Sequence, residues 1–164
     1  MSEAIGTIVD FLDRIGIPVR AGVVPVDAFL PGLQIAAGGL VYDAAALRWP
    51  GDLLHEAGHI ATIPAAQRCQ LNDDLVDAPT SAHAGEAEAT AWAFAALTHL
   101  RLPLTLLFHD GGYRGNSAGL IATFSMGVYP GCHGLVRAGM TLTGDAAAAA
   151  GVAPYPHMIR WLRA

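Results

Sequence analysis

The sequence predicts a single α+β domain over residues 1–164, with helices packed on a small antiparallel sheet. Three observations support this prediction. Residues 4–15 carry apolar side chains at helical spacing, and the alanine-rich residues 85–97 are typical of a closely packed helix. Residues 33–43 contain two short apolar runs joined by glycines, which is typical of a β-hairpin. A chain of this length can bury a substantial hydrophobic core.

Glycine and proline mark the element boundaries in the N-terminal half. We expect the first helix to end at Gly16, and Pro25 limits the following VVPV run to an edge strand. The hairpin is expected to turn at Gly38–Gly39, because glycine supplies positive φ. Pro50 suits the first turn of a second helix, which ends at Pro64.

The C-terminal half is expected to be mostly helical. After a polar loop over residues 64–80, Thr80 or Ser81 is expected to cap a third helix that runs to about Leu100. A glycine-rich loop follows at residues 109–117. The remaining expected helices are, in order, 117–127, 131–139, 145–151 with Asp145 as its N-cap, and 155–163.

Composition excludes several classes of function. The net charge is −5 and no basic run is present, which argues against a nucleic-acid partner. The chain has no lysine, which excludes Schiff-base catalysis and a Walker A site. The longest apolar stretch, residues 89–108, is interrupted by Arg101 and Pro103, so we expect no membrane span. The N-terminus lacks the pattern of a signal peptide, so we expect a cytoplasmic protein whose Cys69 and Cys132 are free thiols.

One apolar segment, GDLLHEAGHIAT at residues 51–62, holds His55, Glu56 and His59 in an H-E-x-x-H pattern. Residues four apart on a helix lie on one face, so both imidazoles can bind one metal ion. The carboxylate of Glu56 can reach a water on that ion and act as general base. A shuffled chain of this composition would contain the pattern about 0.007 times, so we predict a catalytic zinc site rather than a pair of core histidines.

A catalytic zinc site has three protein ligands and one open position, so a third ligand is expected from another segment. Two of the four glutamates in the chain, Glu86 and Glu88, begin the alanine-rich helix. They lie about 200° apart around a helix, so only one can face the metal. Glu86 shares its face with small residues and with Thr90, which favours Glu86 as the ligand. Glu88, His83 and Asp77 are the alternatives.

The motifs together resemble those of the ImmA/IrrE group of zinc metallopeptidases. LLHEAGHIA is followed, 27 residues after His59, by EAEATAWAFAAL, and the family pattern there is E-x-x-A-[ND]-x-[FW]-A. The matching positions are Glu86, Ala89, Trp92 and Ala93. Thr90 stands where the family has Asn or Asp. The stretch GGLVYDAAALRWPGDLLHEAGH is also similar to the family's hairpin before the active-site helix, so the resemblance covers about residues 33–97.

This resemblance implies a zincin-like fold with a gluzincin-type site. His55, His59 and Glu86 would bind Zn²⁺, and Glu56 would be the base. The implied activity is metal-dependent hydrolysis of a peptide bond in a peptide or protein substrate. The sequence does not specify the substrate, a required partner or the oligomeric state.

A hydrolase of this kind also needs a hydrogen-bond donor for the developing oxyanion. The downstream candidates are His109, Tyr113, Arg114, Tyr129, His133 and His157. We favour Tyr113 and His133 as catalytic residues, because glycine-rich segments surround both. Each could instead make an ordinary loop contact.

Two other functions fit parts of the sequence. GNSAG matches the G-x-S-x-G pattern of serine hydrolases, and Asp145 and His157 follow Ser117 in the order that such enzymes use. The match is weak, because no predicted strand precedes Ser117, whose simpler role is a helix N-cap. The chain could also be a regulatory or interaction protein that binds metal without turnover, although binding alone does not need Glu56.

Overall fold

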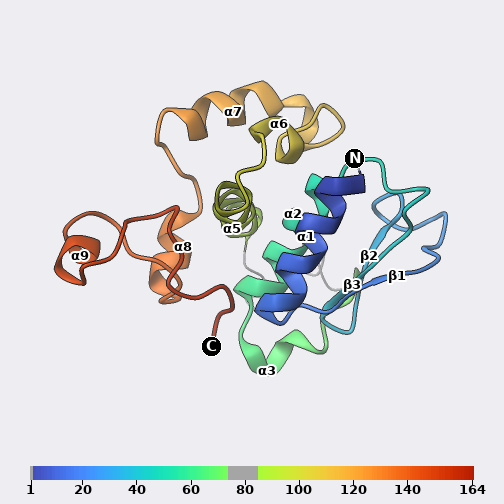
Figure 1. The fold of residues 1–164 in the computed structure, drawn as a ribbon, viewed down its shortest axis with the longest axis horizontal. Coiled ribbons are helices and arrows are strands. Elements are labelled where there is room, and N and C mark those ends of the chain that lie inside the picture. Colours follow the sequence, from blue (N-terminus) through green and yellow to red (C-terminus); the bar gives the residue numbers. More distant parts are fainter. Residues whose placement is uncertain (1, 74–84) are drawn as a thin grey trace.

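A computed structural model describes residues 2–73 and 85–164. In these residues the chain forms a mixed α/β arrangement of helices around one small sheet (Figure 1). The strands are β1 (Val19–Ala21), β2 (Leu33–Ala36) and β3 (Gly39–Tyr42). The longer helices are α1 (Ser2–Ile15), α2 (Gly51–Thr62), α5 (Glu86–His99) and α7 (Ser117–Ser125). The short ones are α3 (Ala65–Arg68), α6 (Leu104–Leu107), the 3₁₀ turn η1 (Tyr113–Gly115), α8 (Cys132–Arg137) and α9 (Gly144–Ala149).

The three-stranded sheet is mixed, with the order β1-β3-β2. β2 and β3 pair antiparallel, as expected, but β1 pairs parallel to β3, so the prediction of an antiparallel sheet was wrong. The expected edge strand at VVPV is also absent from the described residues, since the strand lies at residues 19–21. Gly22 still donates its N–H to the Tyr42 carbonyl at 2.9 Å. Pro25 has no N–H, and the chain turns there instead, with the Ala28 N–H bonded to its carbonyl.

The β2–β3 hairpin turns at Ala37 and Gly38, one residue earlier than predicted. Both residues have positive φ, 50° and 74°, as a two-residue type I′ turn requires. Gly39 instead belongs to β3, where the backbone of Pro18 comes close. A Cβ at position 39 would lie 2.8 Å from the Pro18 carbonyl oxygen. The second glycine therefore permits strand packing and does not form the turn.

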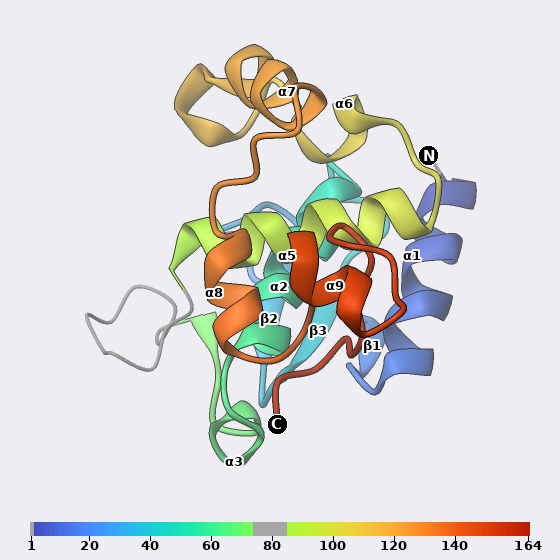
Figure 2. The ribbon, with the colours of Figure 1, turned by 90° about the vertical axis from the view of Figure 1, so that its left-hand side faces the viewer.

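Helix α5 lies at the centre of the molecule and packs along α2 (Figures 1 and 2). Residues 89–97 of α5 are all buried, which accounts for an alanine-rich helix that is apolar on every side. On its other sides α5 contacts α6 and α8. Trp92 of α5 packs against Phe11 of α1, with ring centroids 6.3 Å apart. Helix α2 in turn contacts α1 and the strands β2 and β3, so it links the sheet to α5.

The closing segment, residues 155–163, is not the helix that the sequence predicted. Its backbone groups bond to distant parts of the chain instead of to one another. The Arg163 N–H donates to the Ala61 carbonyl at the end of α2, and the Trp161 carbonyl accepts the indole N–H of Trp92 at 2.8 Å. The Arg163 guanidinium also bonds the Thr62 carbonyl at 3.3 Å. Tertiary hydrogen bonds have replaced the helical ones.

The other expected helices are present, with shifted ends. α7 and α8 lie within the predicted ranges 117–127 and 131–139. α9 begins at Gly144, one residue before the predicted range 145–151, and its N-cap is Thr143 and not Asp145. Gly85 occupies the N-cap of α5, and the predicted caps Thr80 and Ser81 lie outside the described residues. No helix in the described ranges is long and apolar enough to cross a membrane. Both cysteines are free thiols.

Candidate metal centre

Helix α2 carries His55, Glu56 and His59 close together on a mostly apolar helix. A metal-ligating atom from each of His55, Glu56 and His59 lies within 4.8 Å of the others. Glu56 and His59 are buried, at 8 % and 5 % exposure, and His55 is partly buried. The rings of His55 and His59 are 5.0 Å apart and nearly perpendicular, at 83°. This group can hold a metal ion, as the H-E-x-x-H spacing predicted.

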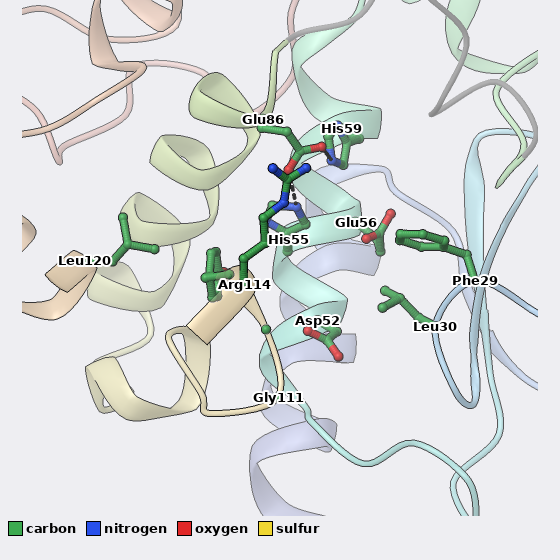
Figure 3. Close-up of a pocket in the computed structure, with 12 residues that line it drawn as sticks. Phe29, Leu30, Asp52, His55, Glu56, His59, Glu86, Gly111, Arg114 and Leu120 are labelled. Atoms are coloured by element: carbon green, nitrogen blue, oxygen red, sulfur yellow. Dashed lines mark ion pairs between the residues drawn. The ribbon is translucent and has the colours of Figure 1, made fainter. Parts of the chain in front are cut away.

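The carboxylate of Glu86 lies between the two imidazoles, reaching them from the first turn of α5 (Figure 3). Its Oε2 is 3.2 Å from Nε2 of His55, and its Oε1 is 3.3 Å from Nε2 of His59. Glu88 faces α8 instead, because a Cβ built at Gly134 of α8 would lie 2.3 Å from its Cγ. The structure therefore brings Glu86, and not Glu88, to the histidines.

The other two alternatives for the third ligand, His83 and Asp77, lie outside the described residues.

Close packing of α2 on α5 brings the Glu86 carboxylate within reach of the two histidines. Gly58 lies on α2 between the two histidines, against the backbone of Ala89. A Cβ at position 58 would be only 2.5 Å from the Ala89 carbonyl oxygen. Ala89 follows Glu86 by three residues and so shares its side of the helix. The glycine of the motif thus sets the separation between the two ligand-bearing helices.

The donor set fits a zinc ion in both chemistry and spacing. Zinc takes imidazole nitrogen and carboxylate oxygen at about 2.0–2.2 Å, so two tetrahedral ligands of one ion lie about 3.3 Å apart. Each oxygen of Glu86 lies at about this distance from one imidazole nitrogen, Oε2 at 3.2 Å from His55 and Oε1 at 3.3 Å from His59. Nδ1 of His55 is buried and has no hydrogen-bond partner among the described residues. Nε2 is the ring nitrogen of His55 that contacts Glu86.

The charged groups of the centre perturb one another strongly. Burial lowers the pKa of His55, but the hydrogen bond to Glu86 and the nearby carboxylates outweigh burial and leave that pKa raised. The hydrogen bonds from His55 and His59 hold the pKa of Glu86 far below its usual range. Burial raises the pKa of Glu56 above its ordinary value. Glu86 therefore carries its negative charge between the two imidazoles.

The centre lies in a cleft of about 750 Å³. Its described lining residues are Phe29, Leu30, Asp52, His55, Glu56, His59, Glu86, Gly111, Gly112, Tyr113, Arg114 and Leu120. The ring of Tyr113 stands nearly perpendicular to that of His55, with centroids 5.9 Å apart. Tyr113, Arg114 and Gly115 all have positive φ, a conformation that costs roughly 1–2 kcal/mol for each non-glycine residue. Strained backbone thus carries two side chains into the cleft, a common property of functional sites.

A second polar pair supports this wall of the cleft and was not identified as a pair from the sequence. Nε2 of the buried His109 lies 2.8 Å from Oδ1 of Asp52, and its ring stacks on Trp49 at 4.5 Å. Burial raises the pKa of Asp52 despite the contact with His109. The sequence did contain one indication that Asp52 belongs to the cleft. Asp52 precedes His55 by three residues and therefore lies on the same face of the helix.

The remaining sequence candidates lie elsewhere. His133 is exposed on α8 and does not line the cleft, so the structure does not bring it to the histidines. Tyr129 packs in an aromatic cluster, 5.5 Å from the ring of Phe94. His157 is exposed on the closing segment. Of the downstream candidates, only Tyr113 and Arg114 are among the described residues that line the cleft.

Ser117 does not have the surroundings of a catalytic serine. It is buried at the start of α7 and donates its hydroxyl hydrogen to the backbone carbonyl of His109. The 3₁₀ turn η1 precedes it, whereas a nucleophile elbow follows a strand. Its proposed partners Asp145 and His157 are both exposed.

No protein-family model, curated protein or solved structure matches this chain.

Proposed function

We propose that this protein is a zinc-dependent peptidase of the ImmA/IrrE type, with a zincin-like fold. The observation that carries the proposal is the Glu86 carboxylate, which lies within 3.3 Å of Nε2 of both motif histidines. Two imidazoles and one carboxylate form the ligand set of a catalytic zinc site with one open position. Glu56, the adjacent carboxylate that mere binding would not need, supports a hydrolytic role.

In this proposal His55, His59 and Glu86 hold the zinc ion. When bound, zinc would polarise the substrate carbonyl and lower the pKa of the attacking water. Glu56 accepts a proton from that water as its oxygen adds to the carbonyl carbon. The C–N bond then breaks, and the proton passes from Glu56 to the departing amine. The products are a carboxylate and an amine, and no other reactant is needed.

Tyr113 is the proposed donor to the oxyanion. Its phenol lines the cleft beside His55, and burial, together with the negative charges of Asp52, Glu86 and Glu56, holds its pKa well above the usual value. The hydroxyl thus keeps its proton at neutral pH and can donate it in a hydrogen bond. Exposed His133, the other residue favoured from the sequence, has no role in this proposal.

Metal analysis tests the proposal first. Protein purified without added metal, and then incubated with zinc, is compared with Glu56→Gln and His59→Ala. We expect about one zinc per chain in the wild type and in Glu56→Gln, and clear loss in His59→Ala, because only the histidine is a ligand. Failure of the wild type to bind zinc would refute the proposal.

Peptide-bond cleavage needs a separate measurement. A peptide library is digested with zinc-loaded wild type, and the products are identified by mass spectrometry. Glu56→Gln, which should retain zinc, is the matched control and should give no products. Zinc binding without cleavage in the wild type would favour the alternative, a metal-binding protein without turnover.

A further inference from the structure

One side of the cleft is apolar and open to solvent. Phe29 is 74 % exposed and Leu30 is partly buried, and both line the cleft. In Figure 3 the ring of Phe29 points toward the carboxylate of Glu56. The Leu33 N–H bonds to the Leu30 carbonyl at 3.2 Å, which fixes this end of the loop to the edge strand β2. Apolar side chains that lie next to each other and remain exposed at the edge of a cleft are typical of a binding surface.

The charged groups near this apolar surface select against one class of ligand. Glu56 and Asp52 are the carboxylates on this side of the cleft, and Arg114 lies across from them (Figure 3). An acidic side chain placed against Phe29 would approach two carboxylates and lose its hydration. A bulky apolar side chain would instead cover Phe29 and Leu30 and displace water from both.

We propose that Phe29 and Leu30 form a subsite for a bulky apolar side chain of a peptide substrate, next to the bond that is cut. This inference rests on the proposed peptidase function, since it specifies the substrate of the same centre. The occupant is an unfolded peptide segment with residues such as leucine or phenylalanine at this position. Leu120, on the opposite side of the cleft, gives the segment a second apolar contact.

The test measures binding, so that it does not depend on turnover. Zinc-loaded Glu56→Gln is titrated by calorimetry with capped pentapeptides of glycine in which the central residue is phenylalanine, leucine, alanine, aspartate or lysine. We expect the phenylalanine and leucine peptides to bind about tenfold more tightly than the alanine peptide. The aspartate peptide should bind no more tightly than the alanine peptide, because Asp52 is still a carboxylate on this side of the cleft in Glu56→Gln. A preference for lysine or aspartate, or equal affinity throughout, would overturn the subsite.

Two further variants locate the effect. Phe29→Ala, in the same Glu56→Gln background, should clearly reduce the ratio of phenylalanine to alanine affinity, with Leu30 left to supply the remaining preference. Val26→Ala is the matched control, because Val26 is fully exposed on the same loop and does not line the cleft. It should leave the ratio unchanged. A ratio that survives Phe29→Ala would refute the assignment.

Cleavage by the wild type separates this inference from the proposed function. If the peptides bind with the expected preference and no peptide of a library is cut, the peptidase proposal fails, and Phe29 and Leu30 remain a binding surface for apolar side chains. If a peptide library is cut with no apolar preference around the cleaved bond, the peptidase proposal stands and the subsite fails.

Discussion

The contact between Gly58 and Ala89 makes Gly58→Ala a sharp test of how the centre is assembled. The added Cβ would lie 2.5 Å from the Ala89 carbonyl oxygen and 3.0 Å from its Cα. Ordinary contacts begin near 3.4 Å, so the two helices must separate locally by about 1 Å. Both neighbours are backbone atoms, which cannot rotate away as a flexible side chain could.

The expected cost in folding stability is the difference between two effects. Overpacking of this kind costs about 1–3 kcal/mol. Alanine in a helix interior is about 1 kcal/mol more favourable than glycine. Because the clash is with backbone, we expect an overpacking cost near the upper end, about 3 kcal/mol. After the gain from helix propensity, the free energy of unfolding should fall by about 1–2 kcal/mol. The matched control is Gly6→Ala in α1, where a Cβ would meet nothing within 4 Å. This control should gain about 1 kcal/mol.

The separation of α2 and α5 should also weaken zinc binding. Glu86 precedes Ala89 by three residues, so it moves away from the histidines with the helix. A shift of about 1 Å is half the length of a zinc–oxygen bond, so we expect the zinc dissociation constant to rise at least about tenfold. Urea unfolding of the metal-free protein and competition with a chelator measure the two effects. A Gly58→Ala protein that is stabilised like Gly6→Ala and keeps its zinc affinity would refute the reasoning.

Three further predictions concern single side chains. Glu86→Gln should raise the zinc dissociation constant by about tenfold or more in a chelator competition, while Glu88→Gln, which alters a residue facing α8, should leave it unchanged. Tyr113→Phe should keep zinc but lower kcat by about 10²–10³ on any peptide that the wild type cleaves; an unchanged kcat would remove Tyr113 from the mechanism. Ser117→Ala should lose about 1 kcal/mol of unfolding free energy, because the His109 carbonyl loses a buried hydrogen bond. Complete loss of hydrolysis in Ser117→Ala, with zinc still bound, would instead favour a serine hydrolase.

Local patterns predicted the parts of the fold that carry the centre. The helix periodicity around H-E-x-x-H and the alanine-rich run correspond to α2 and α5, and both pack in the core. The angular argument that separated Glu86 from Glu88 agrees with the contacts of the two side chains. These predictions were correct because the spacing of residues along a helix determines the side of the helix on which each side chain lies. No contact with a distant part of the chain is needed to predict it.

The errors arose where the partner of a segment is distant in sequence. The parallel pairing of β1 depends on β3, about 20 residues away, and no local pattern distinguishes parallel from antiparallel pairing in a three-residue strand. Residues 155–163 have helical apolar spacing, but their backbone bonds to α2 and α5. The contact between His109 and Asp52 was missed for the same reason, since 57 residues separate them.

The closing segment also has a consequence for the order of folding. The last carbonyls of α2, at Ala61 and Thr62, would lack partners at a free helix end, and Arg163 donates to both of them. These bonds join residues about a hundred positions apart, so closing them requires a long loop of chain to be ordered. The C-terminal turn of the helix that carries both histidines is therefore capped only when residues 161–163 are in place.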